Sequence, residues 1–212
     1  MSRHRQHVNP LKASYFERPA ERLELPAGRE VEVELGCADA QFLFQRAERA
    51  PGIVPIGIEI REDLAAEVNA RARRLGSPVR VLFAHANLDF AGLFAPASLA
   101  RVFVNFPDPW FKRRHHKRRV MDRALAGAIA DALRPGGELF FQSDVWDVAL
   151  DALAVLEDER RLVNRGGAWS FWKAANPYGA RSRREDGCLE ACLPIWRLLY
   201  ATAPPARATP AP

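Results

Sequence analysis

An aspartate flanked by two prolines stands where the chain leaves an apolar segment. The residues are Phe106-Pro107-Asp108-Pro109-Trp110, and the prolines restrict the backbone on both sides of the carboxylate. A carboxylate held in a fixed place can orient a ligand or stabilise positive charge that develops on it. An ordinary Asp-Pro turn would have the same sequence, so the neighbouring residues must distinguish the two interpretations.

A dense run of positive charge follows this aspartate. Six of the eight residues from 112 to 119 are lysine or arginine, in a chain of 212 residues with a formal net charge of +5. Clustered positive charge favours a polyanionic partner, although a solvated charged surface is the alternative for any short basic run. The predicted phosphate contacts are Arg113, Arg114, Lys117, Arg118 and Arg119.

Three further segments end in residues that suit a nucleotide-like cofactor. Gly36 opens a turn that lets backbone approach a ligand, but Ala38 and Ala40 follow where glycine would adopt positive φ more easily. Glu59 lies about twenty residues beyond the turn, where an acid accepts hydrogen bonds from ribose hydroxyls. His85 follows the next segment, where contacts with adenine are expected. NAD enzymes and S-adenosylmethionine enzymes share this arrangement, so these residues alone leave the cofactor open.

These side chains need a scaffold that brings them together. Alternating or continuous apolar patterns predict strands over residues 31–35, 55–60, 79–84, 101–106, 138–142 and 193–200. Helical periodicity predicts helices over residues 41–49, 64–75, 121–133 and 146–157, and residues 160–192 are predicted to be irregular. Alternation of strands and helices predicts an α/β fold with a mostly parallel sheet and helices on both faces. Ligands bind such sheets at the carboxyl ends of the strands, where the polar residues above are found.

Composition narrows the remaining possibilities. No segment approaches the roughly 20 apolar residues of a membrane span, and no apolar stretch of a signal peptide follows the N-terminus. Cys37, Cys188 and Cys192 are too few for a disulfide framework or a convincing metal site. We therefore expect a cytoplasmic protein that uses no metal. The sequence leaves a monomer and a homodimer open. We predict an N-terminal arm over residues 1–29, one domain over residues 30–202 and a disordered tail over residues 203–212.

The central segment FPDPWFKRRHHKRR resembles the signature of the bacterial tRNA (guanine-N(7)-)-methyltransferases, FPDPW-x-K-x-RH-x-KRR. Other segments are similar to the family's motifs in the same order, and together they span residues 3 to 200. They are RHRQHVNPL (residues 3–11), VELG (33–36), GIEI (57–60), Ser143-Asp144, SRRE (182–185) and LPIWR (193–197).

The resemblance implies a Rossmann-like class I methyltransferase, with a mostly parallel seven-stranded sheet, over residues 30–202. It implies methyl transfer from S-adenosylmethionine to N7 of a guanine in tRNA, in the variable loop. The residues that it assigns to the cofactor are Glu34, Gly36, Glu59, His85 (by position) and Asp108. Those that it assigns to the substrate, with Asp108 between the two ligands, are Lys112, Asp144, Ser182 and Glu185.

The chemistry of guanine N7 fits this set of residues. N7 carries a lone pair and no proton, so methylation needs no strong base and depends on positioning and on exclusion of water. Asp108, the predicted catalytic residue, and Asp144 would stabilise the positive charge that develops on the purine. Ser182 and Glu185 by themselves also match a helix capping box. A catalytically impaired RNA-binding relative and a methyltransferase for another RNA or a small molecule remain alternatives, with an NAD oxidoreductase as a more distant one.

Overall fold

The computed structural model describes residues 21–110 and 119–203; most of the predicted N-terminal arm, residues 111–118 of the basic segment and residues 204–212 of the predicted tail lie outside the described residues. The strands are β1 (Val31–Leu35), β2 (Val54–Glu59), β3 (Arg80–Phe83), β4 (Leu99–Asn105), β5 (Leu133–Ser143), β6 (Leu162–Asn164) and β7 (Trp196–Thr202). The helices are α1 (Gln41–Arg49), α2 (Glu62–Leu75), α3 (Ala86–Leu93), α4 (Arg123–Ala132), α5 (Trp146–Asp158) and α6 (Arg183–Glu190).

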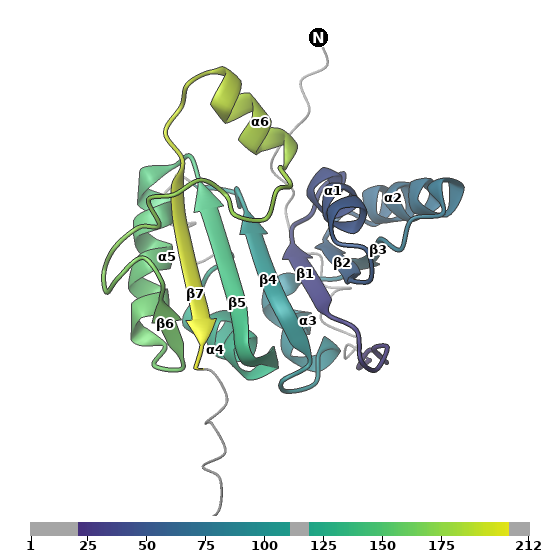
Figure 1. Cartoon of the computed structure of the whole chain (residues 1–212), viewed down its shortest axis with the longest axis horizontal. Helices are drawn as coiled ribbons and strands as arrows, with labels where there is room; N and C mark the ends of the chain where they lie inside the picture. Colours follow the sequence, from purple (N-terminus) through teal and green to yellow (C-terminus); the bar gives the residue numbers. More distant parts are fainter. Residues whose placement is uncertain (1–20, 111–118, 204–212) are drawn as a thin grey trace, which may run out of the picture.

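The described strands form one seven-stranded sheet in the order β3-β2-β1-β4-β5-β7-β6 (Figure 1). Strands β1 to β5 are parallel, while β7 runs antiparallel to both β5 and β6. The predicted mostly parallel seven-stranded sheet is thereby confirmed. The strand order reverses between β1 and β4, and the carboxyl ends on either side of such a point are where ligands bind in open α/β sheets.

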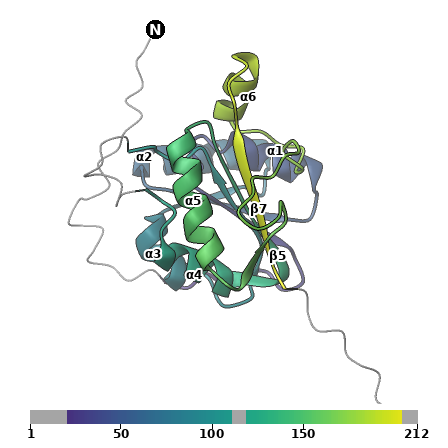
Figure 2. The same ribbon diagram turned by 90° about the vertical axis from the view of Figure 1, so that its left-hand side faces the viewer.

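Apolar residues on both faces of the sheet explain why helices cover it on two sides (Figures 1 and 2). Successive residues of a strand point to opposite faces. In β4, Val102 and Val104 pack with α3, α4 and α5, whereas Phe103 packs with α1 and α2. The apolar residues that recur along the strands and along the helices therefore meet in one core of three layers, in which the sheet lies between two layers of helices.

Four elements differ clearly from the sequence predictions. The prediction of irregular structure over residues 160–192 is wrong for β6 and α6, and α3 was not expected. β6 is only three residues long, and α6 (RREDGCLE) has too few apolar residues for a clear periodicity. The strand predicted from residue 138 begins at Leu133, directly after α4, so that the Arg-Pro-Gly-Gly sequence lies inside β5.

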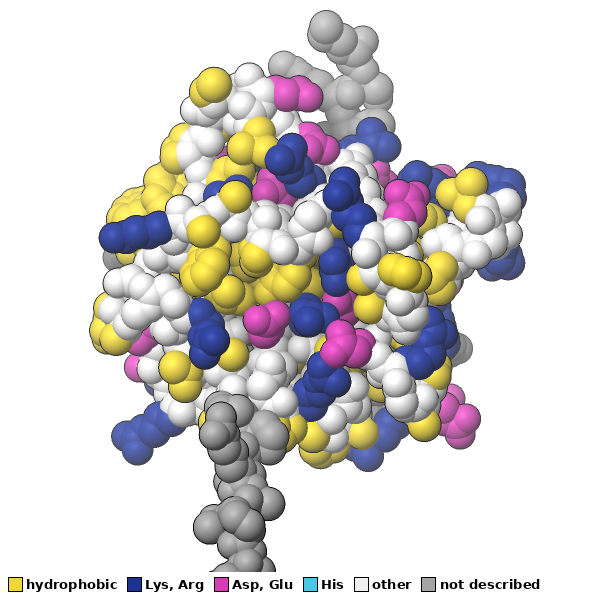
Figure 3. Space-filling view, viewed as in Figure 1, with side chains coloured by type: hydrophobic (Ala, Val, Ile, Leu, Met, Phe, Trp, Pro, Cys, Tyr) yellow, Lys and Arg dark blue, Asp and Glu magenta, His cyan; other side chains and the backbone are white. Residues whose placement is uncertain are grey.

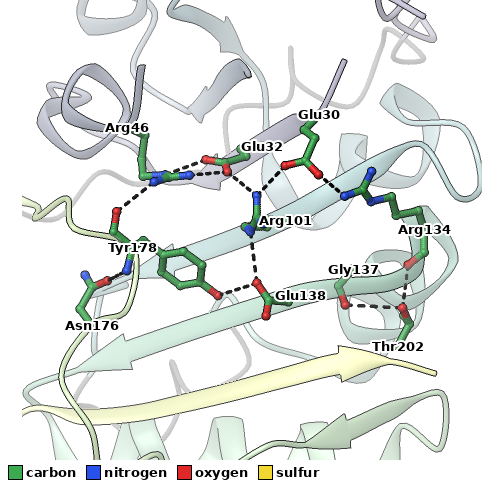
Figure 4. A network of polar contacts seen from close by, with 10 residues as sticks. All are labelled: Glu30, Glu32, Arg46, Arg101, Arg134, Gly137, Glu138, Asn176, Tyr178 and Thr202. Atoms are coloured by element: carbon green, nitrogen blue, oxygen red, sulfur yellow. Dashed lines mark hydrogen bonds and ion pairs between the residues drawn. The ribbon is translucent and has the colours of Figure 1, made fainter. Parts of the chain in front are cut away.

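A charged row crosses the α1 side of the sheet near the beginnings of the strands (Figure 4). Arg101 of β4 lies opposite Glu32 of β1 and Glu138 of β5, and it donates to both carboxylates at 2.8 and 3.1 Å. Opposite charges on neighbouring strands stabilise their pairing. The hydroxyl of Tyr178 also donates to Glu138, at 3.2 Å. This contact fastens the covering segment, which we define as residues 172–182, to the sheet.

The covering segment leads directly into α6. The ring of Tyr178 packs edge-on against Phe103 and Phe140, with ring centroids 4.9 and 5.2 Å apart. The backbone N–H of Trp172 donates to the carbonyl of Arg197 at 2.7 Å. These contacts hold the segment over the sheet and place α6 beyond the carboxyl ends of β4 and β5 (Figure 1).

Candidate active site

The turn after β1 has a left-handed backbone in spite of its alanines. Gly36, Ala38 and Ala40 have φ of 69°, 49° and 54°. For alanine this conformation costs roughly 1–2 kcal/mol per residue, and surrounding contacts must offset that cost. One such contact is the N–H of Ala38, which donates to Oε2 of Glu59 at 3.0 Å. Ala38 and Ala40 therefore both adopt the left-handed conformation that glycine would adopt more easily.

Glu59 ends β2 and is buried beside this turn. Besides the Ala38 bond, its carboxylate accepts the N–H of Arg61 at 2.9 Å and the guanidinium of Arg61 at 2.8 and 3.1 Å. The pKa of Arg61 is raised, chiefly by its hydrogen bonds to Glu59 and also by the charges of Glu59 and Asp108. The Arg61 guanidinium thus lies near two of the three acidic residues that were predicted to contact the cofactor, Glu59 and Asp108. Sequence reasoning missed this arginine, although its position two residues after Glu59 was a signal.

Two buried side-chain atoms have no hydrogen-bond partner among the described residues, and both belong to predicted cofactor residues. Glu34 is 2% exposed; its Oε1 accepts from Nδ2 of Asn105 at 2.7 Å, while Oε2 is unpartnered. Burial raises the pKa of Glu34 to about 8. Nδ1 of His85 is the second atom, and burial lowers the pKa of this histidine. Because buried polar atoms normally have partners, both are suited to a ligand that supplies the missing contacts.

The segment around Asp108 is constrained beyond the effect of its prolines. Phe106 and Trp110, on either side of the Pro-Asp-Pro sequence, have φ of 51° and 42°. Positive φ is uncommon for bulky residues, and such strain is typically found at functional sites. The segment continues from β4 through a hydrogen bond from the N–H of Phe106 to the carbonyl of Gln142, at 2.8 Å. Asp108 is half-buried and follows β4 at the switch point of the sheet, and its contacts with the two ligands stay a prediction.

The predicted substrate residues meet at the junction of β5 and α6. Asp144 follows β5 directly and pairs with Arg184 of α6. The hydroxyl of Ser182 accepts from the N–H of Glu185 at 3.2 Å and so caps α6. The carboxylate of Glu185 does not complete the capping box, since it is 1% exposed and accepts from three side chains that come from other elements. The structure brings Asp144, Ser182 and Glu185 together, and their contacts with guanine stay predictions.

Arg119 is buried, which disfavours its predicted contact with phosphate. The other predicted phosphate contacts and Lys112 lie outside the described residues, but Arg119 is described and is only 7% exposed. It donates to the carbonyls of Pro109 and Asp147, at 3.2 and 3.1 Å, and pairs with Asp151. A guanidinium that is used in this way has little surface left for phosphate. We therefore assign Arg119 to fastening the end of the basic run to α5.

Replacing Arg119 by methionine is expected to lower the free energy of unfolding by about 2 kcal/mol, because the carbonyls of Pro109 and Asp147 and the carboxylate of Asp151 lose a charged donor that is itself buried. Urea denaturation at neutral pH measures this change. The salt dependence of RNA binding should stay as in the wild type. An Arg119→Met protein of unchanged stability whose salt dependence is weaker would instead support the original assignment to phosphate.

Residues 21–110 and 119–203 contain neither a candidate membrane-spanning helix nor a candidate metal-binding cluster. No helix there is long and apolar enough to cross a membrane. No group of three or more His, Cys, Asp or Glu side chains there is arranged to hold a metal ion.

Comparison with known proteins identifies the family. A family model described as "Putative methyltransferase" matches residues 28–197. The chain is 38% identical over 202 residues to the tRNA (guanine-N(7)-)-methyltransferase of Synechococcus sp. (strain JA-3-3Ab), covering 91% of this chain and 83% of the relative. It is 37% identical over 211 residues to that of Synechocystis sp. (strain ATCC 27184 / PCC 6803 / Kazusa), covering 94% and 97%. The chain belongs to the tRNA (guanine-N(7)-)-methyltransferase family. The family predicted from the FPDPW segment is confirmed.

Solved structures agree with this family at the level of the fold. The chain resembles the 16S rRNA methyltransferase KamB with a TM-score of 0.59 and 13% identity, over 82% of this chain and 88% of that chain. It resembles the aminoglycoside resistance methyltransferase NpmB1 with a TM-score of 0.54 and 19% identity, again over 82% and 88%. This member of the tRNA (guanine-N(7)-)-methyltransferase family thus has the predicted class I methyltransferase fold.

Proposed function

We propose that this protein transfers a methyl group from S-adenosylmethionine to N7 of a guanine in the variable loop of tRNA. The observation that carries the proposal is the position of three acidic residues, Glu34, Glu59 and Asp108, at the carboxyl ends of β1, β2 and β4 beside the switch point of the sheet. Family membership supports the reaction. We expect the enzyme to act in the cytoplasm as a monomer or a homodimer.

The residues around the turn after β1 fit the cofactor. S-adenosylmethionine, when bound, supplies a methyl group on a positively charged sulfur. Glu34 and His85 have the buried atoms that are open to a ligand. Glu59 would hold the ribose hydroxyls, and the side chain of Arg61, which is 40% exposed, can turn away from it without disturbing the core. The left-handed turn at Ala38 and Ala40 favours an active enzyme over a catalytically impaired relative.

Two acidic side chains of this protein, Asp108 and Asp144, supply what the guanine needs for the reaction. Guanine N7 has no proton to remove, so Asp108 acts by orienting the purine and by stabilising positive charge on it. Asp144 is paired with Arg184, whose side chain is half exposed and can exchange for donors of the guanine edge. Both carboxylates act more strongly where water is excluded.

Methyl transfer from tritiated S-adenosylmethionine to unmodified tRNA, followed by digestion to nucleosides, tests the proposal. We expect label in 7-methylguanosine, lost when the target guanine in the variable loop is replaced. Label in another nucleoside, or only in another RNA, would reassign the substrate. Binding of tRNA without any transfer would support the impaired relative.

Binding of tRNA should depend on the basic run. On the face seen in Figure 3, basic and acidic side chains are interspersed around a hydrophobic area, so the described residues there form no continuous positive surface. Replacing Arg114, Lys117 and Arg118 by alanine should weaken tRNA binding and flatten the plot of log affinity against log salt by about 0.7–0.9 per lost phosphate contact. Filter binding at several salt concentrations measures the slope, and calorimetry should find cofactor binding unchanged. An unaltered slope would mean that the run is a solvated surface.

A further inference from the structure

A second polar row crosses the α1 side of the sheet, at the ends of the strands that face the active site. Asn105 of β4 lies opposite Gln142 of β5, and Gln142 lies opposite Arg197 of β7. Asn105 and Gln142 are buried, and neither is among the residues that the family motifs assign to a ligand. Their positions inside apolar strands, where polar side chains are costly, call for an explanation.

Hydrogen bonds join this row to both halves of the active site. Nε2 of Gln142 donates to Oδ1 of Asn105 at 3.0 Å and to Oε2 of Glu185 at 2.8 Å. Nδ2 of Asn105 donates to Oε1 of Glu34 at 2.7 Å. These hydrogen bonds form a continuous network from Glu34, a predicted cofactor residue, to Glu185 in α6.

Arg197 fixes the direction of every bond in the network. A guanidinium only donates, and Nε of Arg197 donates to Oε1 of Gln142 at 3.1 Å while Nη2 donates to Glu185 at 3.2 Å. The amide nitrogen of Gln142 must therefore face Glu185 and Asn105, so Asn105 must present its own nitrogen to Glu34. Turning either amide over would place donor against donor or acceptor against acceptor. The arrangement has a single low-energy state.

We propose that Gln142 is a positioning residue for methyl transfer. Its amide fixes α6, with Ser182 and the Asp144–Arg184 pair, relative to Glu34 on the cofactor side. The inference rests on the proposed function and adds to it the hydrogen bonds that set the distance between cofactor and guanine. Direct displacement needs the two reacting atoms in line, and a misplacement of about 1 Å can cost about a hundredfold in rate.

Gln142→Met tests this role, because methionine has nearly the same length but no amide. The expected kcat is roughly 10- to 100-fold below that of the wild type, with the KM for tRNA and the affinity for S-adenosylmethionine nearly unchanged. Tyr200→Phe is the matched control. It removes a hydrogen bond that the hydroxyl donates to Glu157 of α5 and one that it accepts from Asn164 of β6, and it should lower stability without changing kcat.

A second variant cuts the same network at its other end. Asn105→Ala leaves the contact between Gln142 and Glu185 in place but separates both from Glu34. If the network acts as a unit, the double variant should be about as slow as the slower single variant, since changes within one network are not additive. Asn105→Ala by itself also covers the case in which Gln142→Met folds poorly.

The outcomes separate the positioning role from the proposed function. If kcat per folded molecule is unchanged in Gln142→Met, or in Asn105→Ala where the former does not fold, the positioning role is overturned and the proposed function stands. Multiplying rate losses in the double variant would also overturn it, because independent effects do not indicate one network. If wild-type protein transfers no methyl group to tRNA, the proposed function fails and the positioning role fails with it.

Discussion

Replacing Asp108 by asparagine is expected to slow methyl transfer by about a hundred- to a thousandfold, because a preorganised charge at the reacting centre is lost. Asparagine keeps the size of the side chain, and Pro107 and Pro109 still frame it. The fold should persist, since Asp108 is half-buried beside Arg61 and lies in the segment after β4, outside the apolar core. Single-turnover transfer from labelled cofactor measures the chemical step, and filter binding of tRNA on the same preparation measures affinity. Transfer should collapse while affinity falls only slightly.

Asp131→Asn is the matched control for this experiment. It makes the same change of charge at an exposed position of α4, where Asp131 pairs with Arg161. Transfer by this control should equal that of the wild type. If a correctly folded Asp108→Asn protein also transfers at nearly the wild-type rate, Asp108 is a turn residue and the proposed charge stabilisation is wrong.

Replacing Glu59 by glutamine should weaken binding of S-adenosylmethionine by roughly 1.5–3 kcal/mol, or about 10- to 150-fold, through loss of charged hydrogen bonds to the ribose. Glutamine keeps one acceptor oxygen for the N–H of Ala38, so the turn after β1 should keep its shape. Calorimetry with S-adenosylmethionine and with its demethylated product measures the change. Both ligands should be affected alike, because they share the ribose.

Glu62→Gln provides the control for Glu59. It makes the same substitution three residues later, at an exposed position in the first turn of α2. Equal affinities of wild type, Glu59→Gln and Glu62→Gln would show that Glu59 only stabilises the turn and Arg61. Binding of NAD in place of S-adenosylmethionine would contradict the proposed cofactor.

The sequence by itself determined the layers of the fold and the identity of the central motif. β1, α1, β2 and α2 have apolar residues at the period of their own secondary structure, so each could be predicted from a local pattern. The Pro-Asp-Pro segment and the acid at the end of β2 were equally local signals. Local signals suffice for such features because the physical cause, one apolar face per element, is contained within the element.

Only the tertiary structure decided what the polar side chains contact. The alternation of β1 suggested nothing of the burial of Glu34, which follows from α1 and α2 covering that face of the sheet. Arg119 is chemically equal to the other arginines of its run, yet it lies against α5. α6, with little apolar periodicity, is held by Glu185, whose partner Gln142 lies 43 positions earlier in the chain. Hydrogen bonds between distant residues depend on the order of the strands and on the face of the sheet that each side chain occupies. Neither can be predicted from the local apolar pattern that predicted the elements.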